Sequence, residues 1–115
     1  MTSFFKTFRH AVRGIGDGFR GELNFRIHFV AAIAVVVLGF WMGVSRMEWL
    51  VLVLTIAFVL SLELVNSALE RAMDVLHPSM HDRVRVVKDM LAASVLVSSL
   101  AAIAIGLLIF VPYFV

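Results

Sequence analysis

The chain has 115 residues, of which 62% are apolar, and its mean hydropathy is +1.01. An ordinary soluble domain is roughly 45–50% apolar, so the composition predicts a single integral membrane domain over residues 1–115. The formal charge of +2 is small and the ten Lys and Arg are segregated along the chain, a pattern of membrane orientation and not of nucleic-acid binding. Without cysteine, the chain has no disulfide, thiolate metal site or cysteine nucleophile.

Residues 2–20 predict an amphipathic helix on the membrane surface. At 100° per residue its apolar residues share an arc of about 100°, and most of its charged residues lie opposite. The apolar set is Phe4, Phe5, Phe8, Val12, Ile15 and Phe19, and the basic set is Lys6, Arg9 and Arg13. The glycines of "GIGDGFRG" predict a flexible joint before the first span; a phosphate-binding loop is disfavoured because no strand precedes them and no G-K-[ST] follows.

Three transmembrane helices are expected, over about 27–45, 48–70 and 89–112. The first and third come from long uncharged runs that can cross a hydrocarbon core of about 30 Å. Between Trp49 and Leu62 the uncharged run has only 14 residues. A span needs about 20, so the second helix must continue through Glu63 and Asn66.

The basic residues also predict the orientation. All but Arg46 lie before the first span or around the second connection. By the positive-inside rule the N-terminus faces the cytoplasm and the C-terminus faces outward. We therefore expect a multi-pass protein of the bacterial cytoplasmic membrane, with Trp41, Trp49 and Tyr113 near the outer headgroups.

The stretch "SLELVNSALERAMD" places four polar side chains on one face of the second span. On a helical wheel Glu63, Asn66, Glu70 and Asp74 share an arc of roughly 80°. With a span ending near Ala68, Glu63 lies about 7 Å inside the hydrocarbon edge, and Glu70 and Asp74 emerge at the interface. Carboxylates at such a depth are costly and indicate a function.

This polar face has the chemistry that a lipid kinase needs. A magnesium nucleotide requires oxygen ligands, a hydroxyl acceptor requires a base, and the transferred phosphoryl group requires cations. The candidates are Glu22, Glu70 and Asp74 for metal, Glu63 for the base, and Arg9, Arg26 and Lys88 for phosphate.

Local ion pairs are the simpler interpretation for some of these residues. Asp74 could pair with Arg71, Glu22 with Arg26, and Asp89 with its neighbour Lys88. His77 and His81 are separated by Pro78, which favours a solvated loop over a metal site.

The chain resembles the prokaryotic diacylglycerol kinase family, which includes undecaprenol kinases. The resemblance rests on "ELNFRIH", on "ELVNSALERAMD" and on "KDMLAASVL", and it covers essentially the whole chain. It implies an all-α homotrimer of three-span protomers with active sites between subunits. It also implies direct transfer of the γ-phosphoryl group from magnesium ATP to a membrane lipid alcohol.

The resemblance assigns roles by position. Glu63 corresponds to the family's catalytic base, Asn66 to an amide that helps hold the site, and Glu22 and Glu70 to its Mg²⁺ ligands. Lys88 and Asp89 correspond to the pair near the phosphates, and Arg9 and Arg26 to supporting basic positions.

Two departures from the diacylglycerol-specific type favour undecaprenol as substrate. That type is more polar where this chain has Ile27 and His28, and it has a Gly-Ser pair where this chain has Leu91 and Ala92.

Two other functions remain open at this point. Intramembrane carboxylates also form relays, so the chain could be a small proton or cation transport protein. Small residues recur every four positions in the third span, at Ser94, Ser98, Ala102 and Gly106, as in closely packed membrane helices. This ladder suggests contacts in a homo-oligomer, and the chain could equally be a non-catalytic assembly subunit.

Overall fold

The computed structural model describes residues 2–76 and 82–115, and within them the chain folds into four helices. These are α1 (Thr2–Gly21), α2 (Leu23–Met42), α3 (Arg46–Leu76) and α4 (Asp82–Phe114). The last three are long and apolar enough to cross a membrane, as an all-α membrane protein requires. His77 and His81 lie outside the described residues.

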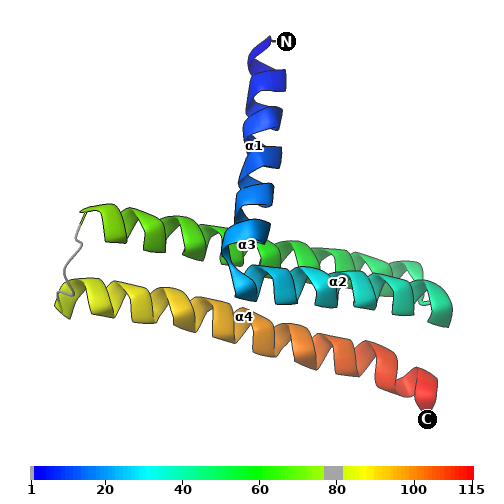
Figure 1. Ribbon diagram of the computed structural model, residues 1–115. Helices are drawn as coiled ribbons and strands as arrows, with labels where there is room; N and C mark the ends of the chain where they lie inside the picture. Colours follow the sequence, from blue (N-terminus) through cyan, green and yellow to red (C-terminus); the bar gives the residue numbers. More distant parts are fainter. Residues whose placement is uncertain (1, 77–81) are drawn as a thin grey trace.

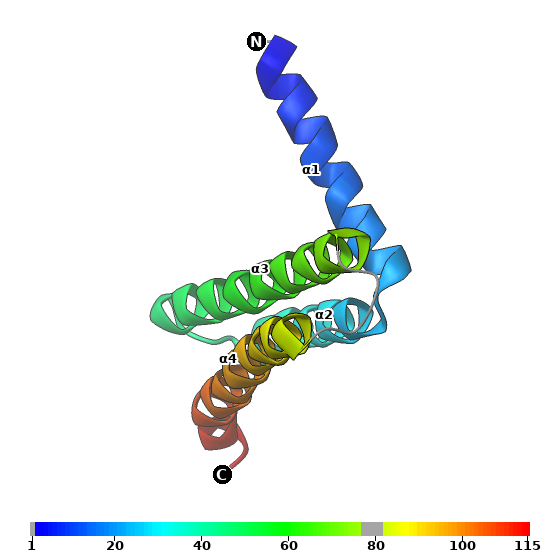
Figure 2. The same ribbon diagram turned by 90° about the vertical axis from the view of Figure 1, so that its left-hand side faces the viewer.

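The three long helices lie side by side, with α3 packed against both α2 and α4, while α1 stands at a steep angle to them (Figure 1). A view turned by 90° shows the same relation, with α1 projecting away from the other helices (Figure 2). If α2, α3 and α4 cross the bilayer, α1 therefore runs roughly along its surface.

The joint expected in "GIGDGFRG" is not a flexible segment, because α1 continues as a helix to Gly21. Glycine is needed here for close packing. A Cβ at Gly18 would lie 2.8 Å from Leu64 Cδ2, so a larger residue here would require the end of the Leu64 side chain to move. The helical conformation is interrupted at Glu22, whose extended backbone separates α1 from α2.

The turn between α2 and α3 is fixed by local chemistry. Gly43 adopts a left-handed conformation, with φ 64°, and so α2 ends at Met42. Ser45 and Glu48 then form a capping box: Ser45 Oγ accepts from the Glu48 amide at 3.2 Å, and Glu48 Oε1 accepts from the Ser45 amide at 2.9 Å. This box starts α3 at Arg46.

The packed core of the bundle lies near this turn. A cluster of Val44, Leu52, Ile109 and Phe110 joins the start of α3 to the end of α4. Tyr113 donates its hydroxyl proton to Glu48 Oε1 at 2.5 Å across the same two helices. These contacts hold α3 and α4 together at the end remote from Glu63.

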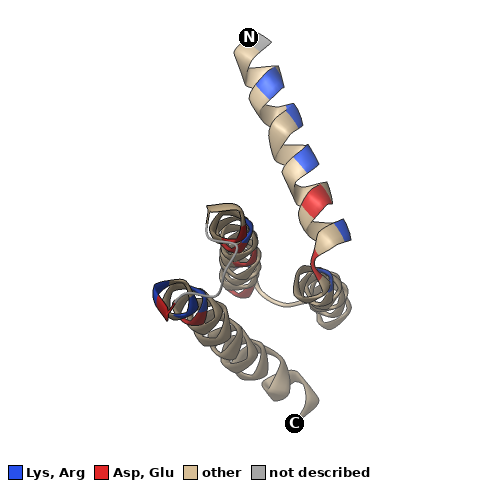
Figure 3. Ribbon diagram, turned by 60° about the vertical axis from the view of Figure 1, so that its left-hand side comes forward, with Lys and Arg blue, Asp and Glu red and all other residues tan. Residues whose placement is uncertain are grey.

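Both α3 and α4 are longer than a membrane crossing requires. Their 31 and 33 residues span about 45–50 Å at 1.5 Å per residue, against a hydrocarbon core of about 30 Å. The charged residues gather at the ends of α3 and α4 that meet around residues 70–89, and along α1 (Figure 3). We call this the charged end of the bundle.

The ladder of small residues on α4 faces the chain's own helices. Ser98 is buried, and Ala102 and Gly106 line a cavity between α2, α3 and α4. Part of the ladder therefore leaves space between the chain's own helices, and its role in contacts of a homo-oligomer stays a prediction.

Candidate active site

Glu63 is among the most buried side chains of the described chain, with 2% of its surface exposed. It lies on α3, three residues before Asn66 and four before the buried Ser67. A carboxylate buried this deeply requires a partner, because removing it from water is strongly unfavourable.

That partner is His28 of α2. Its Nδ1 atom lies 2.5 Å from Glu63 Oε1, and 26% of the imidazole side chain remains exposed. The contact is close but is not an aligned hydrogen bond. Within the described chain, Glu63 Oε1, His28 Nδ1 and Asn66 Oδ1 are all buried without a hydrogen-bond partner. Because Nδ1 and Oε1 lie against each other, Asn66 Oδ1 is the one of the three atoms without such a contact. An unpaired buried oxygen typically costs about 1–3 kcal/mol, which favours a polar ligand beside Asn66.

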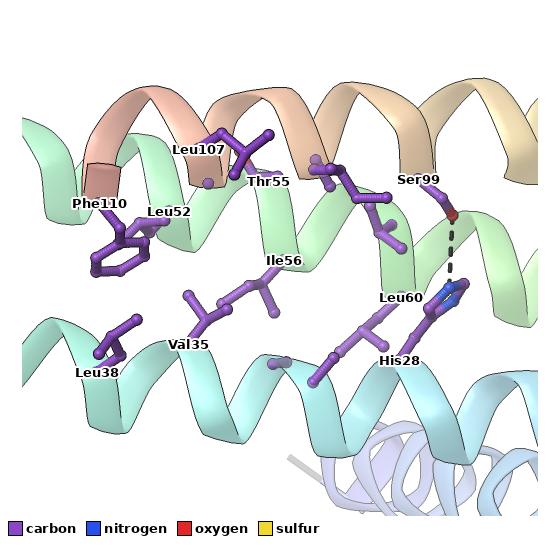
Figure 4. A pocket seen from close by; sticks show the side chains of 16 residues that line it. His28, Val35, Leu38, Leu52, Thr55, Ile56, Leu60, Ser99, Leu107 and Phe110 are labelled. Atoms are coloured by element: carbon purple, nitrogen blue, oxygen red, sulfur yellow. Dashed lines mark hydrogen bonds between the residues drawn. The ribbon is translucent and has the colours of Figure 1, made fainter. Parts of the chain in front are cut away.

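An apolar cavity of about 530 Å³ opens beside this group, between α2, α3 and α4 (Figure 4). His28 and Ser99 lie at one end of it, and Leu38, Leu52 and Phe110 at the other. The His28 Nε2 atom lies 3.5 Å from Ser99 Oγ, a long contact that joins α2 to α4. Thr55 also lines the cavity, but its hydroxyl donates to Val51 O of its own helix, so His28 and Ser99 are the polar groups left for a ligand and they lie at one end.

The charged end contains cross-helix ion pairs that differ from those expected from sequence spacing. Lys88 Nζ contacts Asp74 Oδ1 at 2.5 Å and so connects α4 to α3, whereas Arg71 had been the expected partner of Asp74. Asp89 pairs with Arg85 at 3.0 Å and not with Lys88. This arrangement brings two of the predicted site residues, Asp74 and Lys88, into direct contact.

Glu22 lies at the junction of α1 and α2 and approaches α3. Its Oε1 atom is 3.6 Å from Arg71 Nη2, so the expected pairing with Arg26 is corrected. The contact places Glu22 against the residue that follows Glu70 in α3. Both carboxylates therefore belong to the same end of the bundle.

The described residues contain no cluster of three or more Asp, Glu or His that could hold a metal alone. Mg²⁺ usually binds through one or two carboxylates together with substrate phosphates, so this finding is compatible with a magnesium nucleotide. Glu70 is half-buried and makes no ion pair within the described residues, and Glu22 makes only the long contact to Arg71. These two side chains fit the oxygen donors that such an ion requires.

Arg9 and Arg26, two of the predicted phosphate-binding residues, do not approach the other site residues of the same chain. Arg9 is exposed on α1, about 20 Å along that helix from Glu22. Arg26 is exposed on α2 beside Leu23, Ile27 and Val30. The geometry of the single chain assigns neither of them a contact with Glu63, Glu70 or Lys88.

Sequence reasoning noted His28 only as a departure from a related sequence, and it missed Ser99. One signal could have found His28: it is the only ionisable residue between Arg26 and Arg46. An ionisable side chain within a membrane span is by default a functional candidate. Ser99 has no comparable signal, because serine is common where membrane helices pack.

Comparisons with known proteins agree with the resemblance. The family model of prokaryotic diacylglycerol kinase matches residues 9–110. The undecaprenol kinase of Bacillus subtilis (strain 168) is 41% identical over 112 residues, covering 97% of this chain and 91% of its own length. The diacylglycerol kinase of Synechocystis is 34% identical over 92% of this chain and 61% of its own length. The diacylglycerol kinase of Escherichia coli (strain K12) is 27% identical over 90% of this chain and 84% of its own length.

Proposed function

The chain belongs to the prokaryotic diacylglycerol kinase family and is a multi-pass membrane lipid kinase, and from that premise we propose that its substrate alcohol is undecaprenol. The proposal is that the γ-phosphoryl group of magnesium ATP passes directly to the lipid hydroxyl and gives undecaprenyl phosphate. The observation that carries it is a buried carboxylate, Glu63, beside a cavity that is apolar except at the end next to it.

Glu63 supplies the basic carboxylate of this reaction. The lipid oxygen forms a bond to the γ-phosphorus in line with the departing ADP oxygen, and the hydroxyl proton leaves toward Glu63. Asn66, one helical turn closer to the charged end, has a buried carbonyl oxygen without a partner and orients the polar groups in this space. No covalent intermediate on the protein is needed, because positioning and charge stabilisation account for catalysis in phosphoryl transfer.

The nucleotide binds at the charged end. Glu22 and Glu70 would hold Mg²⁺, which would supply positive charge to the phosphates of ATP. Lys88 provides a cation for the transferring group, and Asp74 holds the Lys88 ammonium by their ion pair. Asp89 orders the same turn of α4 through Arg85.

Arg9 and Arg26 act on a neighbouring subunit's nucleotide in this proposal. Both are exposed and lie apart from the site residues of their own chain. In a homotrimer with sites between protomers, these two arginines would contact the nucleotide of the neighbouring subunit. The trimer would also cover part of the apolar surface of the three long helices.

The hydrocarbon chain of the lipid lies in the cavity between α2, α3 and α4. From His28 to Leu38 the cavity wall follows α2 for about 15 Å. A lipid alcohol has one polar group at the end of a long apolar chain, which matches a cavity with a single polar end. The hydroxyl would then lie at the same depth as Glu63.

The preference for undecaprenol has two supports. The Bacillus subtilis relative named undecaprenol kinase is 41% identical, whereas the relatives named diacylglycerol kinase reach 34% or less. In addition, this chain has His28 on α2 and the apolar Leu91 and Ala92 on α4, and it differs at these positions from the diacylglycerol-specific pattern.

The test is a transfer assay with purified protein in lipid bilayers, magnesium and radiolabelled ATP. Undecaprenol and diacylglycerol are offered in parallel, and labelled lipid is extracted and quantified. We expect the larger kcat/KM for undecaprenol. A larger value for diacylglycerol would overturn the substrate assignment, and no label on any alcohol would overturn the kinase chemistry proposed for this site.

A further inference from the structure

Arg71 joins the α3 part of the proposed magnesium site to the junction of α1 and α2. It follows Glu70 directly in α3, and its Nη2 atom is 3.6 Å from Glu22 Oε1. The guanidinium also lies against the end of α1, because a Cβ at Gly21 would overlap Arg71 Nη2. A cation of the same chain is therefore present where the proposed site would receive the phosphates of magnesium ATP.

The contact between Arg71 and Glu22 is loose. Its 3.6 Å is longer than a hydrogen bond between nitrogen and oxygen, which is about 2.7–3.2 Å. The Arg71 side chain is 52% exposed and that of Glu22 is 32% exposed, so water screens the attraction between the two charges. Such a pair is easily exchanged when a stronger partner arrives for either side chain.

The carboxylate of Glu22 is not used to cap α2. Glu22 occupies the N-cap position, where a side-chain oxygen commonly accepts from the first free amides of the helix, but its side chain makes no such hydrogen bond. Within the described residues its carboxylate has Arg71 as its ionic partner. A Mg²⁺ ion that binds Glu22 would therefore have one weak contact to displace, and a carboxylate oxygen is a ligand that this ion prefers.

A guanidinium released in this way is suited to a phosphate group. Its planar fork of N–H groups matches two phosphate oxygens, and these charge-assisted hydrogen bonds are stronger than neutral ones. On a helical wheel Glu70, Asp74 and Arg71 fall within an arc of about 100°. Asp74 holds the ammonium of Lys88. Phosphates beside a magnesium ion at Glu70 would then have two cations of the same chain available, Arg71 and Lys88.

We propose that Arg71 binds the phosphates of ATP by an exchange of partners: Mg²⁺ takes the carboxylate of Glu22, and the freed guanidinium donates to phosphate oxygens of the same nucleotide. The inference rests on the proposed function and adds a nucleotide-binding residue to it. Arg9 and Arg26 do not approach this site in their own chain. Arg71 therefore gives each chain a second phosphate-binding cation besides Lys88.

The first test is equilibrium binding of a non-hydrolysable ATP analogue with magnesium to the protein in bilayers. Arg71→Met removes the charge and keeps an unbranched side chain. We expect its dissociation constant for the analogue to rise about tenfold, because charge-assisted contacts to phosphate are lost. Arg71→Lys should recover only part of the affinity, since an ammonium lacks the planar fork.

Arg20→Met is the matched control for this measurement. Arg20 is also an exposed arginine paired with a carboxylate, that of Asp17 on α1, but it lies outside the proposed site. Its dissociation constant should stay within about twofold of wild type, as expected for an exposed pair. An Arg71→Met protein that binds the analogue as tightly as wild type would overturn the proposal.

Nucleotide without metal separates partner exchange from a merely structural ion pair. When a chelator replaces magnesium, Glu22 still holds Arg71 in the wild type. Glu22→Gln removes this hold, so the variant should bind the metal-free analogue about threefold more tightly or better. The double variant with Arg71→Met should lose this gain. Absence of the gain in Glu22→Gln, or a gain that persists in the double variant, would contradict the exchange.

Steady-state kinetics show whether Arg71 acts on the nucleotide alone. In Arg71→Met the KM for ATP should rise, while the KM for undecaprenol should stay within about twofold of wild type, because Arg71 does not line the cavity. An equal rise in both KM values would indicate a general disturbance of α1 and α3 and would contradict a nucleotide-binding role. The equilibrium measurements involve no phosphoryl transfer, so their outcome is independent of the kinase assay that tests the proposed function.

Discussion

At the scale of single residues, the polar groups of this chain are sorted by depth. Glu63 and His28 are paired within the bundle, whereas Asp74 and Lys88 pair at its charged end. The buried pair requires each partner, since removing one leaves an uncompensated polar group away from water. The exposed pairs contribute only about 0–1 kcal/mol each to the free energy of unfolding. Their role is to fix the positions of charged groups at the charged end.

The burial of Glu63 could be predicted from the sequence, whereas the partners of Glu63 and Lys88 could not. The uncharged run of 14 residues after Glu48 and Arg46 is too short to span a membrane, which is why the burial of Glu63 could be predicted. Its partner could not, because His28 lies 35 positions earlier on another helix. The sequence also predicts Lys88 near the phosphates. Its contact with Asp74, however, depends on how α4 packs on α3, and residue spacing within one helix does not determine that packing.

Glu70 gives a prediction about magnesium. Glu70→Gln removes one anionic oxygen ligand while keeping the size of the side chain, so the Mg²⁺ concentration for half-maximal activity should rise about tenfold or more. The measurement is a magnesium titration of kcat at saturating ATP. Asp17→Asn serves as the control, since Asp17 is an exposed residue of α1 paired with Arg20. A titration that matches wild type would remove Glu70 from the ligands.

Lys88 gives a prediction that separates stability from catalysis. Lys88→Met breaks an ion pair in which the Asp74 side chain is 63% exposed, so unfolding free energy should change by only about 0–1 kcal/mol. Loss of the cation near the phosphates should instead lower kcat by about tenfold or more. Thermal unfolding and turnover are measured on the same preparations, with Lys6→Met as control, since Lys6 is an exposed lysine of α1 outside the proposed site. Equal turnover in Lys88→Met and wild type would show that Lys88 does not touch the reacting phosphates.

At the scale of elements, helix identity was predictable and helix contacts were not. The uncharged runs and the amphipathic start indicate four helical segments, and the structure contains four. The glycines before Glu22 were taken for a joint because glycine weakens isolated helices. In the structure Gly18 allows α1 to pack on Leu64, and tertiary contact outweighs the low helical propensity. The ladder on α4 likewise permits close packing, but the spacing of its small residues does not specify which helix packs against it.

Gly106 tests whether the cavity accommodates the lipid. Gly106 lines the cavity and a Cβ there would meet no atom within 4 Å, so a leucine side chain at this position would start in open space and take up part of the cavity. We expect KM for undecaprenol to rise about tenfold, with a smaller effect on KM for ATP, because filling the space excludes the hydrocarbon chain. The matched control is Ala104→Leu, on an exposed position of the same helix that does not line the cavity. If both variants bind undecaprenol like wild type, the chain of the lipid lies elsewhere.

At the scale of the whole molecule, the arrangement of the helices agrees with a membrane orientation. The bundle of α2, α3 and α4 carries most of its charge at one end (Figure 3), and α1 leaves the bundle at a steep angle (Figure 1). Such a shape lets three helices cross the bilayer while α1 lies on one surface. We propose that this surface is cytoplasmic, in accordance with the distribution of Lys and Arg.

The absence of cysteine makes this topology directly testable. Single cysteines are introduced at Ser3 on α1, at Met47 at the start of α3, and at Val115. In intact cells a membrane-impermeant thiol reagent should label Met47→Cys and Val115→Cys, whereas Ser3→Cys should react only after the cells are opened. Labelling of Ser3→Cys in intact cells would reverse the proposed orientation.

Subunit number is tested in the same membranes. The exposed positions of Arg9 and Arg26 lead us to expect a trimer in which neighbours complete each site, so chemical crosslinking should trap dimers and trimers. A crosslinking pattern with monomer alone would mean that one chain contains the entire site.

The central claim is that the buried Glu63 carboxylate drives proton removal during phosphoryl transfer, and it is tested most directly by Glu63→Gln. The substitution keeps the shape of the side chain but removes its charge. The measurement is the rate of labelled undecaprenyl phosphate formation in bilayers from radiolabelled magnesium ATP. We expect the variant to fold and assemble like wild type and to lose about 10²- to 10⁴-fold in kcat. A folded Glu63→Gln protein that transfers phosphate at the wild-type rate would contradict the account.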